Sequence, residues 1–427
     1  MSIYQDWGFM SNPFETTPLS PDDKGQSLLV GRDAELVQLR RRLENPPRIP
    51  TLEGLNGVGK SSLVNVAAYS SYAEFLQNPS RIMLIPCRRA FQLSPTLSID
   101  VFVGNVFREV AQTLIEQAQL IEGNHIKFAA RHRSLDQWLN KAQLASFQAG
   151  ISIVSGGITN ETNTGDGFSR SGFNNAVRNW LKEIFPTAQD GGVVCVIDNL
   201  ELLQTSDVAR QQLEALRDEL LMVSGLRWVL CGALGIVLGV ASSPRLEGFL
   251  NRPIEIGGIQ PQYISDIFDS RVESFRERFE PYLPLIVNDF ARLYSILFQN
   301  LRSLLGHADD YCQWIADRDR PSSDNIKSKM FQQWLDEISR AAYESALSQL
   351  GQRAWRVFED AIAVDGSFAP SDFEHFQFNS IPAFRPHVRD LEASGLVVST
   401  QDEGDKRRKT VQITPKGWLA HEWMRRI

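Results

Sequence analysis

The sequence predicts an α/β protein, in which a parallel sheet covered by helices is followed by a helical region and a small C-terminal domain. Three observations predict this fold class. A loop of the form G-x-x-x-x-G-K-S lies at 54–61, between a strand pattern and a helix pattern. A continuous apolar run at 193–198 ends in a carboxylate, as a strand buried on both faces of a sheet would. Residues 352–427 change to helices followed by two short strands.

The loop at 54–61 matches the phosphate-binding P-loop. Its glycines permit a tight turn in which successive N–H groups point inward toward phosphate oxygens. Lys60 would reach the β- and γ-phosphates, and Ser61 would ligate Mg²⁺. A strand over 49–53 and a helix over 61–68 complete the context, since a helix N-terminus favours phosphate. We expect ATP and Mg²⁺ as cofactors, with nucleotide contacts from Gly54, Asn56, Gly57, Val58, Gly59, Lys60, Ser61 and Ser62.

The apolar run at 193–198 predicts a central strand whose last residue, Asp198, emerges at the edge of the sheet where ligands bind. Asp198 can therefore hold Mg²⁺ opposite Ser61, although it could also simply cap the next segment. The next residue is Asn199, which cannot accept a proton, so the role of general base passes to Glu201 or is missing. We therefore expect slow hydrolysis.

Composition and charge narrow the classes of function. A net charge of −7 predicts no general attraction to nucleic acid, so any such contact must be a local patch. Cys87, Cys195, Cys231 and Cys312 form no C-x-x-C pair, which favours reduced, buried thiols over disulfides or a zinc site. No signal-peptide pattern begins the chain, and the longest apolar run, 228–241, is too short and glycine-rich to span a membrane. We expect a cytoplasmic protein with no membrane partner.

Two segments of the N-terminal half carry open alternatives. A helix over 34–43, capped by Asp33, could merely pack on the sheet, or the turn Val30-Gly31-Arg32 before it could lie over the adenine. After a strand at 82–87 and helices at 99–118 and 134–146, a strand-like stretch at 147–154 leads into a Gly/Ser/Thr/Asn tract at 155–172. This insertion, about 147–172, is either a solvated loop or a contact to DNA or a neighbouring subunit.

Two further strands are predicted at 226–232 and 253–256, the first ending beside the γ-phosphate. Arg245 and Arg252 lie before the last strand. Either could reach the nucleotide of a neighbouring protomer as an arginine finger, or could form an ordinary surface ion pair. The chain from 262 to about 347 is helical, and Arg302 lies in a run at 293–314 with helical apolar spacing, where it could be a salt-bridge partner or could sense the γ-phosphate.

The C-terminal residues predict a winged helix: helices at 352–364, 371–376 and about 382–393, then a strand, a polar turn, a strand and a last helix after 414–417. Phosphate and groove contacts are expected from the third helix and the wing, at Arg385, His387, Arg389, Lys406, Arg407, Arg408 and Lys409. Residues 352–427 hold 11 Lys and Arg against 11 Asp and Glu, a net charge of zero, and winged helices also dock proteins. The expected domains are a P-loop core at 1–260, a helical lid at 261–347 and a winged helix at 352–427.

Residues 1–345 resemble AAA+ ATPases of the initiator clade, the origin-recognition and Cdc-type proteins, and the related STAND ATPases. The resemblance rests on Asn12-Pro13-Phe14, the turn at 30–32, the P-loop, the strand ending at Asp198 and a lid with Arg302 in the "sensor 2" setting. It implies an AAA+-like P-loop NTPase with a C-terminal winged helix, whose end also looks like a MarR-type reader. Asn199 in place of glutamate, Cys231-Gly232 in place of a polar "sensor 1" residue, and the insertion depart from the pattern.

The leading hypothesis is a slowly hydrolysing, ATP-dependent molecular switch that binds DNA and self-associates head to tail. Such switches serve in replication initiation, transposon target selection and anti-phage defence, and the sequence does not choose among these. A second hypothesis is a STAND-type signalling scaffold whose winged helix docks protein, with an effector on another chain. A third is a transcription regulator gated by ATP. The basic wing favours DNA, whereas Asn199 and the neutral domain charge favour a slow switch or a scaffold.

Overall fold

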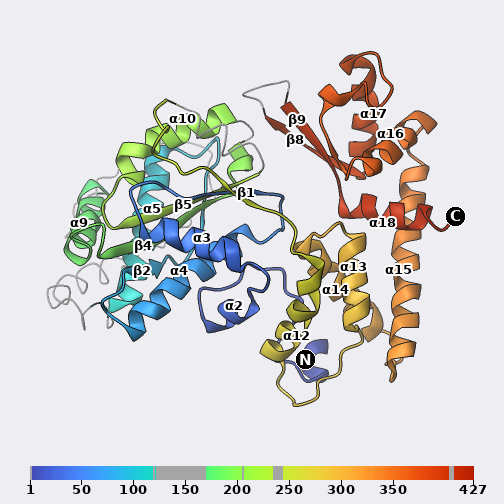
Figure 1. Ribbon diagram of the computed structural model, residues 1–427, viewed down its shortest axis with the longest axis horizontal. Helices are drawn as coiled ribbons and strands as arrows, with labels where there is room; N and C mark the ends of the chain where they lie inside the picture. The colour runs from blue at the N-terminus through green and yellow to red at the C-terminus, as the bar shows by residue number, and fades with distance from the viewer. Residues whose placement is uncertain (1, 119–120, 122–169, 204–205, 234–243, 403–407) are drawn as a thin grey trace, which may run out of the picture.

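The computed structural model describes residues 2–118, 121, 170–203, 206–233, 244–402 and 408–427. A parallel sheet with helices on both faces forms the first part of the chain (Figure 1). A group of helices and a small antiparallel sheet follow it. This arrangement confirms the predicted α/β class, with a parallel P-loop sheet, a helical lid and a C-terminal wing.

The large sheet places the P-loop strand next to an inserted central strand. Its order is β2-β4-β5-β1-β6, with β3 paired to β4, and all these pairs are parallel. The strands are β1 (Thr51–Gly54), β2 (Met83–Pro86), β3 (Phe91–Gln92), β4 (Gly191–Asp198), β5 (Leu226–Gly232) and β6 (Ile254–Ile256). Because the strands are parallel, β1 and β4 end at the same edge, so the loop after β1 meets the carboxylate that ends β4.

The strand β4 shows why both faces of the sheet are covered. Val194 and Val196 face the layer of α3 (Asp33–Glu44) and α4 (Lys60–Gln77). Val193, Cys195 and Ile197 face the opposite layer, as the period of two requires. That layer contains α5 (Ile99–Glu116), α9 (Arg170–Ile184), α10 (Ser206–Leu216) and η2 (Arg217–Leu221). The apolar run that predicted a strand buried on both faces is therefore explained.

Several predicted boundaries shift for local reasons. The helix α3 starts at Asp33, with Arg32 in the cap position, so Asp33 does not cap it as predicted. The helix after the P-loop continues to Gln77 because Tyr72 and Phe75 are also buried. The predicted elements at 134–146 and 147–154 lie outside the described residues. At the far end of the predicted insertion, α9 already begins at Arg170, because its apolar face packs into the core from Phe173 onward.

The lid is built from α12 (Ile264–Phe275), α13 (Val287–Ile296), α14 (Leu301–Ala316) and α15 (Asp324–Leu347), after the short η3 (Pro261–Tyr263). The predicted helical run at 293–314 is divided by a turn. Phe298 and Gln299 have left-handed φ values of 51° and 60°, and the Asn300 side chain caps α14 by accepting from the Ser303 N–H at 3.0 Å. Arg302 therefore lies in the first turn of α14, not in the middle of a packed helix.

The N-terminal segment contains α1 (Ile3–Asp6) and α2 (Asp23–Leu28), and its start lies against the lid (Figure 1). Asn12 accepts a hydrogen bond from the Phe14 N–H at 2.8 Å, and the fully buried Phe14 ring lies between Phe268 and Phe290. The buried Arg271 of α12 donates to the carbonyl oxygen of Pro13 at 2.8 Å. Burial lowers the pKa of the Arg271 guanidinium to about 10, so its charge remains at neutral pH. Asn12-Pro13-Phe14 thus anchors the segment to the lid.

The C-terminal part has a three-stranded sheet in the order β7-β9-β8. Its elements are α16 (Gln352–Ala363), β7 (Ser367–Phe368), η4 (Pro370–Asp372), α17 (Ile381–Ala393), β8 (Val397–Asp402), β9 (Arg408–Ile413) and α18 (Pro415–Met424). The predicted helix at 371–376 is wrong: only the short η4 forms there. Phe376 and Phe378 are both buried around a left-handed Gln377, which has a φ of 59°, and this path cannot continue as a helix.

The four cysteines are buried free thiols, as the sequence predicted. Across the part of the chain that the structure describes, no helix has the length and apolar character needed to cross a membrane.

Phe14→Ala should lower the free energy of unfolding by about 3 to 5 kcal/mol, the usual effect of emptying a buried aromatic position. The matched control is Phe279→Ala, because Phe279 follows α12 and is 84% exposed. This control should change stability by less than about 0.5 kcal/mol. Urea unfolding followed by circular dichroism measures both. Equal destabilisation by the two variants would contradict the anchoring role of Phe14.

Candidate functional site

The P-loop has the backbone that its sequence predicts. Gly57 and Gly59 have φ values of 86° and 96°, which side chains other than glycine rarely adopt. A Cβ on Gly54 would lie 2.3 Å from the Ile256 carbonyl oxygen, and one on Gly57 would lie 2.8 Å from Arg302 Cβ. The loop is therefore pressed between β6 and the lid, and it leads directly into α4, whose first N–H groups have no partner within the helix.

The Lys60 ammonium group lies in the middle of the loop. Lys60 is buried, and its Nζ donates to the carbonyl oxygens of Gly54 at 2.9 Å and Leu55 at 3.1 Å. These contacts hold a positive charge where the phosphates of a nucleotide would lie. The geometry fits the predicted role of Lys60.

Ser61 and Asp198 meet although 137 residues separate them in sequence. The Ser61 hydroxyl donates to a carboxylate oxygen of Asp198, and the other oxygen accepts from the Asn199 N–H at 2.8 Å. Hydroxyl and carboxylate oxygens are ligands that Mg²⁺ prefers, and Mg²⁺ usually takes only one or two of them from the protein. No group of three or more His, Cys, Asp or Glu side chains gathers for a metal within the described residues. A bound Mg²⁺ would therefore rely on phosphate and water for its other ligands.

The chain after Asp198 has an unusual backbone. Asn199 has a φ of 55°, a left-handed value that asparagine tolerates better than most residues. The next residues form η1 (Leu200–Leu203), which contains Glu201. The Glu201 side chain lies outside what the structure describes, so its role as base stays a prediction. At the end of β5 lie the buried Cys231 and Gly232, neither of which has an amide or charged side chain.

A pocket at the P-loop is walled on three sides by segments that lie far apart in the sequence. The loop and Asp198 form one side, and residues 16–19 and 28–30 form another. Residues of the lid close the third side, at Ile267, Arg271, Leu301, Arg302 and Leu305. The wall contributed by residues 16–19 was missed in the sequence, because nothing local marks it. The mixture of an apolar wall with a cationic loop suits a ligand with a flat apolar part and an anionic part.

The turn at 30–32 borders this pocket, and its expected contact with the adenine stays a prediction. Gly31 has a φ of 71°, and a Cβ there would lie 2.8 Å from the Tyr263 ring. Val30 and Arg32 both line the pocket. The Arg32 side chain, however, is buried and donates to the carbonyl oxygens of Val58 at 3.0 Å and Gly257 at 2.6 Å. Its guanidinium thus fastens the P-loop to the segment after β6.

Ser62 lines the pocket, but its hydroxyl oxygen accepts from the Leu19 N–H at 3.1 Å. The Asn65 side chain, one turn further along α4, donates to the Leu19 carbonyl oxygen at 2.8 Å. These two bonds hold the N-terminal segment across the start of α4. In this structure Ser62 therefore positions the pocket wall.

The lid touches the loop directly. Asn300 Nδ2 donates to the Asn56 carbonyl oxygen at 2.9 Å, and the Arg302 N–H donates to the Gly57 carbonyl oxygen at 3.2 Å. The Arg302 side chain is exposed and lines the pocket. Its position agrees with the setting implied by the sequence, whereas the contact through Asn300 was not foreseen.

Arg252 lies at the opposite edge of the sheet from the P-loop, because it closely precedes β6 whereas the loop follows β1. Arg245 lies seven residues before it in the sequence. Neither lines the pocket of its own chain. Arg245 lies 3.9 Å from the Glu214 carboxylate, which is the surface ion pair considered as the alternative. The Arg252 side chain is exposed, and its carbonyl oxygen accepts from Arg42 at 2.6 Å.

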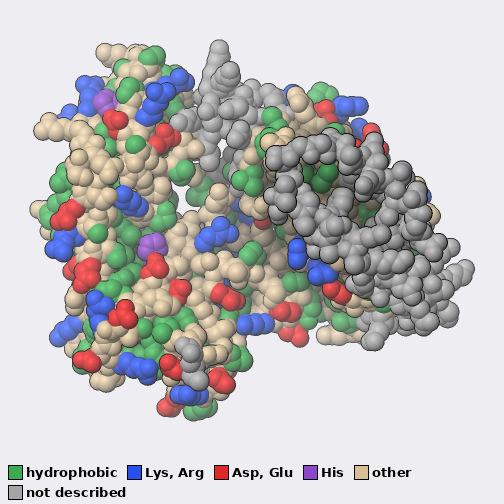
Figure 2. Space-filling view, turned by 180° about the vertical axis from the view of Figure 1, so that it is seen from behind, with side chains coloured by type: hydrophobic (Ala, Val, Ile, Leu, Met, Phe, Trp, Pro, Cys, Tyr) green, Lys and Arg blue, Asp and Glu red, His purple; other side chains and the backbone are tan. Residues whose placement is uncertain are grey.

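A second candidate surface lies on the C-terminal domain. Arg385 and Arg389 are exposed one turn apart on α17, and the ring of the half-buried His387 lies 5.2 Å from that of Phe378. Arg353 of α16 stacks on the same Phe378 ring at 4.6 Å, so it adds a cation to this surface. The sequence did not single out Arg353, because its place beside α17 depends on tertiary packing. Figure 2 shows Lys and Arg side chains gathered over this domain at the upper left.

The wing is described only in part. Arg408 pairs with Asp402 and Lys409 with Gln401 in the β8–β9 ladder, so both lie in the first residues of β9. Lys406 and Arg407 lie outside the described residues. The predicted wing strands are confirmed, and the contacts expected of the four basic residues stay predictions.

No family model matches the sequence, and no curated protein matches it. Among solved structures, the chain is similar to the ORC1 protein of Aeropyrum pernix in complex with DNA, at 14% identity over 98% of this chain and 99% of that one, with a TM-score of 0.46. It is similar to the ORC2 protein of Aeropyrum pernix (ADPNP-ADP complexes), at 10% identity over 98% and 100%, with a TM-score of 0.46.

The chain is also similar to the Walker-type ATPase PABY2304 of Pyrococcus abyssi, at 13% identity over 95% of this chain and 98% of that one, with a TM-score of 0.44. At such identities and TM-scores, the fold assignment rests on the strand order, the P-loop and the order of the domains in this chain.

Proposed function

We propose that this protein is an ATP-dependent molecular switch of the AAA+ type that contacts DNA through its winged helix. The observation that carries the proposal is the meeting of Ser61 and Asp198 beside Lys60 at the P-loop. A hydroxyl, a carboxylate and an ammonium group converge there on a loop that also presents backbone N–H groups. This combination suits a nucleotide phosphate with its metal ion.

In the proposed binding mode, N–H groups of the loop and the start of α4 hold the phosphates. Lys60 exchanges its carbonyl partners, Gly54 and Leu55, for phosphate oxygens. Ser61 and Asp198 hold Mg²⁺, which supplies neutralising charge when bound. The apolar wall, with Val30, Ile259 and Leu305, receives the base.

We propose that hydrolysis is slow. Asn199 follows Asp198 where many ATPases have a glutamate, and an amide cannot accept a proton from the attacking water. The end of β5 offers Cys231 and Gly232 in place of a polar side chain. Glu201 is the candidate that remains for orienting water. Slow turnover suits a protein whose output is a conformation held as long as ATP is bound.

The DNA part of the proposal rests on the clustering of positive charge. Residues 352–427 carry no net charge, yet basic side chains gather over the described part of this domain (Figure 2), and the sequence adds four more at 406–409. Arg385 and Arg389 have the exposed positions on α17 that groove and phosphate contacts require. A basic face on a domain without net charge favours a local contact with DNA over a general electrostatic attraction of the whole domain to DNA.

We also propose head-to-tail self-association. Arg252 is exposed at the sheet edge opposite the P-loop, so it can act only on the nucleotide of another protomer. A contact between two different surfaces forms rings or open helices. Arg245 is the weaker candidate, because Glu214 of the same chain lies close to it.

Lys60→Ala should weaken ATP binding on the order of 100-fold or more, because a charge-assisted bond to phosphate is lost inside a buried loop. Lys182→Ala, which removes an exposed lysine of α9, is the matched control and should bind ATP like the parent. Calorimetric titration with ATP and Mg²⁺ measures both. Unchanged affinity in Lys60→Ala would refute the nucleotide site.

Replacing Lys406, Arg407, Arg408 and Lys409 with alanine should weaken DNA binding for all sequences. The slope of log affinity against log salt should flatten by about one unit for each lost phosphate contact. Arg389→Ala should instead alter any sequence preference, because it can reach base edges. Arg340→Ala, on the exposed face of α15, is the control. Parent-like DNA binding by the wing variant would favour protein docking, as in a signalling scaffold.

Arg252→Ala should prevent the formation of larger species when ATP and Mg²⁺ are added, while ATP affinity stays within about twofold, because the side chain is far from its own pocket. Arg41→Ala, an exposed arginine of α3, serves as the control. Mass photometry with and without nucleotide gives the distribution of species. A parent protein that remains monomeric, or forms a dimer indifferent to nucleotide, would contradict completion of the site by a neighbour.

A further inference from the structure

The turn at 297–300, between α13 and α14, contacts two distant parts of the molecule. On one side, Asn300 donates to the Asn56 carbonyl oxygen at 2.9 Å and so holds the P-loop. On the other side, the Phe298 ring stacks on Trp418 of α18, with centroids 4.5 Å apart and planes at 6°. A few residues therefore join the nucleotide loop to the C-terminal domain.

The backbone of this turn is held in an unfavourable shape. Phe298 and Gln299 are consecutive non-glycine residues in the left-handed region. Residues with a Cβ are strained in this region, because the Cβ comes too close to the following carbonyl oxygen. Such a shape persists only where the surroundings determine it. The contacts of the turn with the P-loop and with Trp418 hold it in this conformation. We therefore expect a movement of the P-loop to be transmitted through the turn to Trp418.

Trp418 is itself built into the winged helix. A Cβ on Gly366 would lie 2.4 Å from the indole ring, so the ring is packed against the turn before β7. The Gly366 carbonyl oxygen accepts from the Ile413 N–H of β9 at 2.8 Å. A displacement of Trp418 therefore displaces the sheet of the wing.

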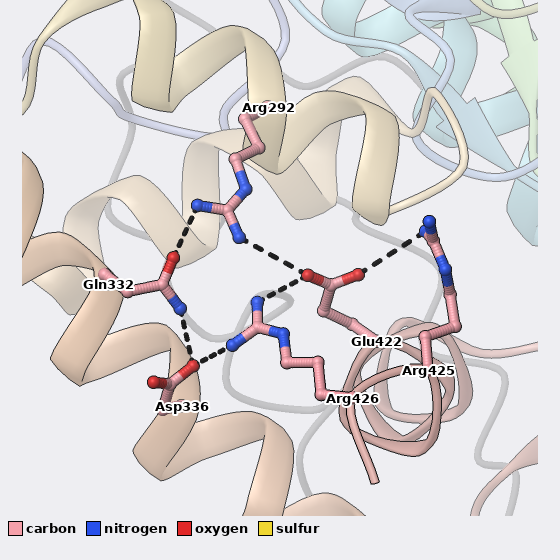
Figure 3. A network of polar contacts seen from close by, with 6 residues as sticks. All are labelled: Arg292, Gln332, Asp336, Glu422, Arg425 and Arg426. Carbon is pink, nitrogen blue, oxygen red and sulfur yellow. Dashed lines mark hydrogen bonds and ion pairs between the residues drawn. The ribbon is translucent and has the colours of Figure 1, made fainter.

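A second connection fixes the angle of α18 against the lid (Figure 3). Arg292 of α13 donates to Gln332 of α15 at 2.6 Å and lies 3.4 Å from the Glu422 carboxylate of α18. Arg426 bonds the same carboxylate at 2.5 Å and also pairs with Asp336 of α15. Because Glu422 is buried and shared by several arginines, its network resists rotation of one helix alone.

The apolar core agrees with these polar contacts. A single cluster of buried side chains runs from the lid, with Leu293, Phe331 and Trp334, to the winged helix, with Phe358 and Leu419. The connection from the sheet to the lid is different, because the sheet has its own clusters of buried side chains. The chain passes there through Gly257 and Gly258; a Cβ on Gly257 would have no neighbour within 4 Å, although one on Gly258 would lie 2.8 Å from Gln299. The stiff joint is therefore between lid and winged helix, and the looser joint is between sheet and lid.

We propose that the lid and the winged helix move as one rigid lever, and that the turn at 297–300 passes the state of the P-loop to it. The regulatory half of this inference rests on the proposed nucleotide binding. The P-loop uses N–H groups for phosphate, while the lid holds its carbonyl oxygens at Asn56 and Gly57. Phosphate on one face of the loop therefore shifts the groups that the lid holds on the other face.

Spin labels test the lever, because the four native cysteines are buried and introduced ones are labelled selectively. One pair is Gln313→Cys on α14 with Glu374→Cys in the winged helix, both at exposed positions. Without nucleotide, the distance distribution of this pair should be narrow. The distribution should become broader when Phe298→Ala and Arg292→Ala are added together. Phe279→Ala with Arg340→Ala, which touches neither connection, is the control and should leave it unchanged.

A second pair, Gln77→Cys at the end of α4 with Glu374→Cys, reports sheet against winged helix. ATP with Mg²⁺ should shift this distance and leave the distance between Gln313→Cys and Glu374→Cys unchanged. Adding Phe298→Ala and Arg292→Ala together should reduce the shift, while calorimetry still detects ATP binding. A broad lid distribution in the parent, or a lid distance that itself shifts with ATP, overturns the lever. If the parent binds no ATP, the proposed function fails, whereas the nucleotide-free measurement still decides whether the lever is rigid.

Discussion

The P-loop has two chemical faces, and the rest of the structure depends on how both are occupied. Its N–H groups and Lys60 face the pocket. The carbonyl oxygens of three consecutive loop residues are bound by other parts of the chain: Asn56 by Asn300, Gly57 by the backbone of Arg302, and Val58 by Arg32. The bond to Val58 is buried, where an unpaired carbonyl oxygen would be costly. The segments that supply them, α3 and the lid, are thereby fixed around the site.

The N-terminal segment connects the lid to the sheet domain by a second route, separate from Gly257 and Gly258. Phe14 is buried in the lid, while Leu19 is bonded to Ser62 and Asn65 at the start of α4. Residues 14–19 thus contact both the lid and the start of α4, which lie on different sides of the pocket. A motion of the lid must therefore also move residues 16–19, which form a wall of that pocket. We therefore expect the lid and the pocket wall at residues 16–19 to move together.

Much of the fold could be predicted because its signals are local. The P-loop, the apolar run ending in Asp198 and the strands of the wing all follow from patterns within about ten residues. The features that were missed depend on distant partners. Arg32 is bound by carbonyl oxygens 26 and 225 residues away. The left-handed turn at Phe298 has no sequence signature, because glycine and asparagine normally mark such positions. Arg353 gains its place only once α16 packs against α17.

The core shared by lid and winged helix has a consequence for cooperativity. Composition suggests a boundary near 348–351, where Ser348, Gln349 and Gly351 surround the buried Leu350. Yet α18, at the end of the chain, packs along α15, which precedes that boundary. The last helix of the winged-helix domain therefore packs on the lid, although most of that domain lies between them in the sequence. Heat or denaturant should melt residues from 264 to 427 in one transition, and a fragment ending at the apparent linker would expose the apolar side of α15.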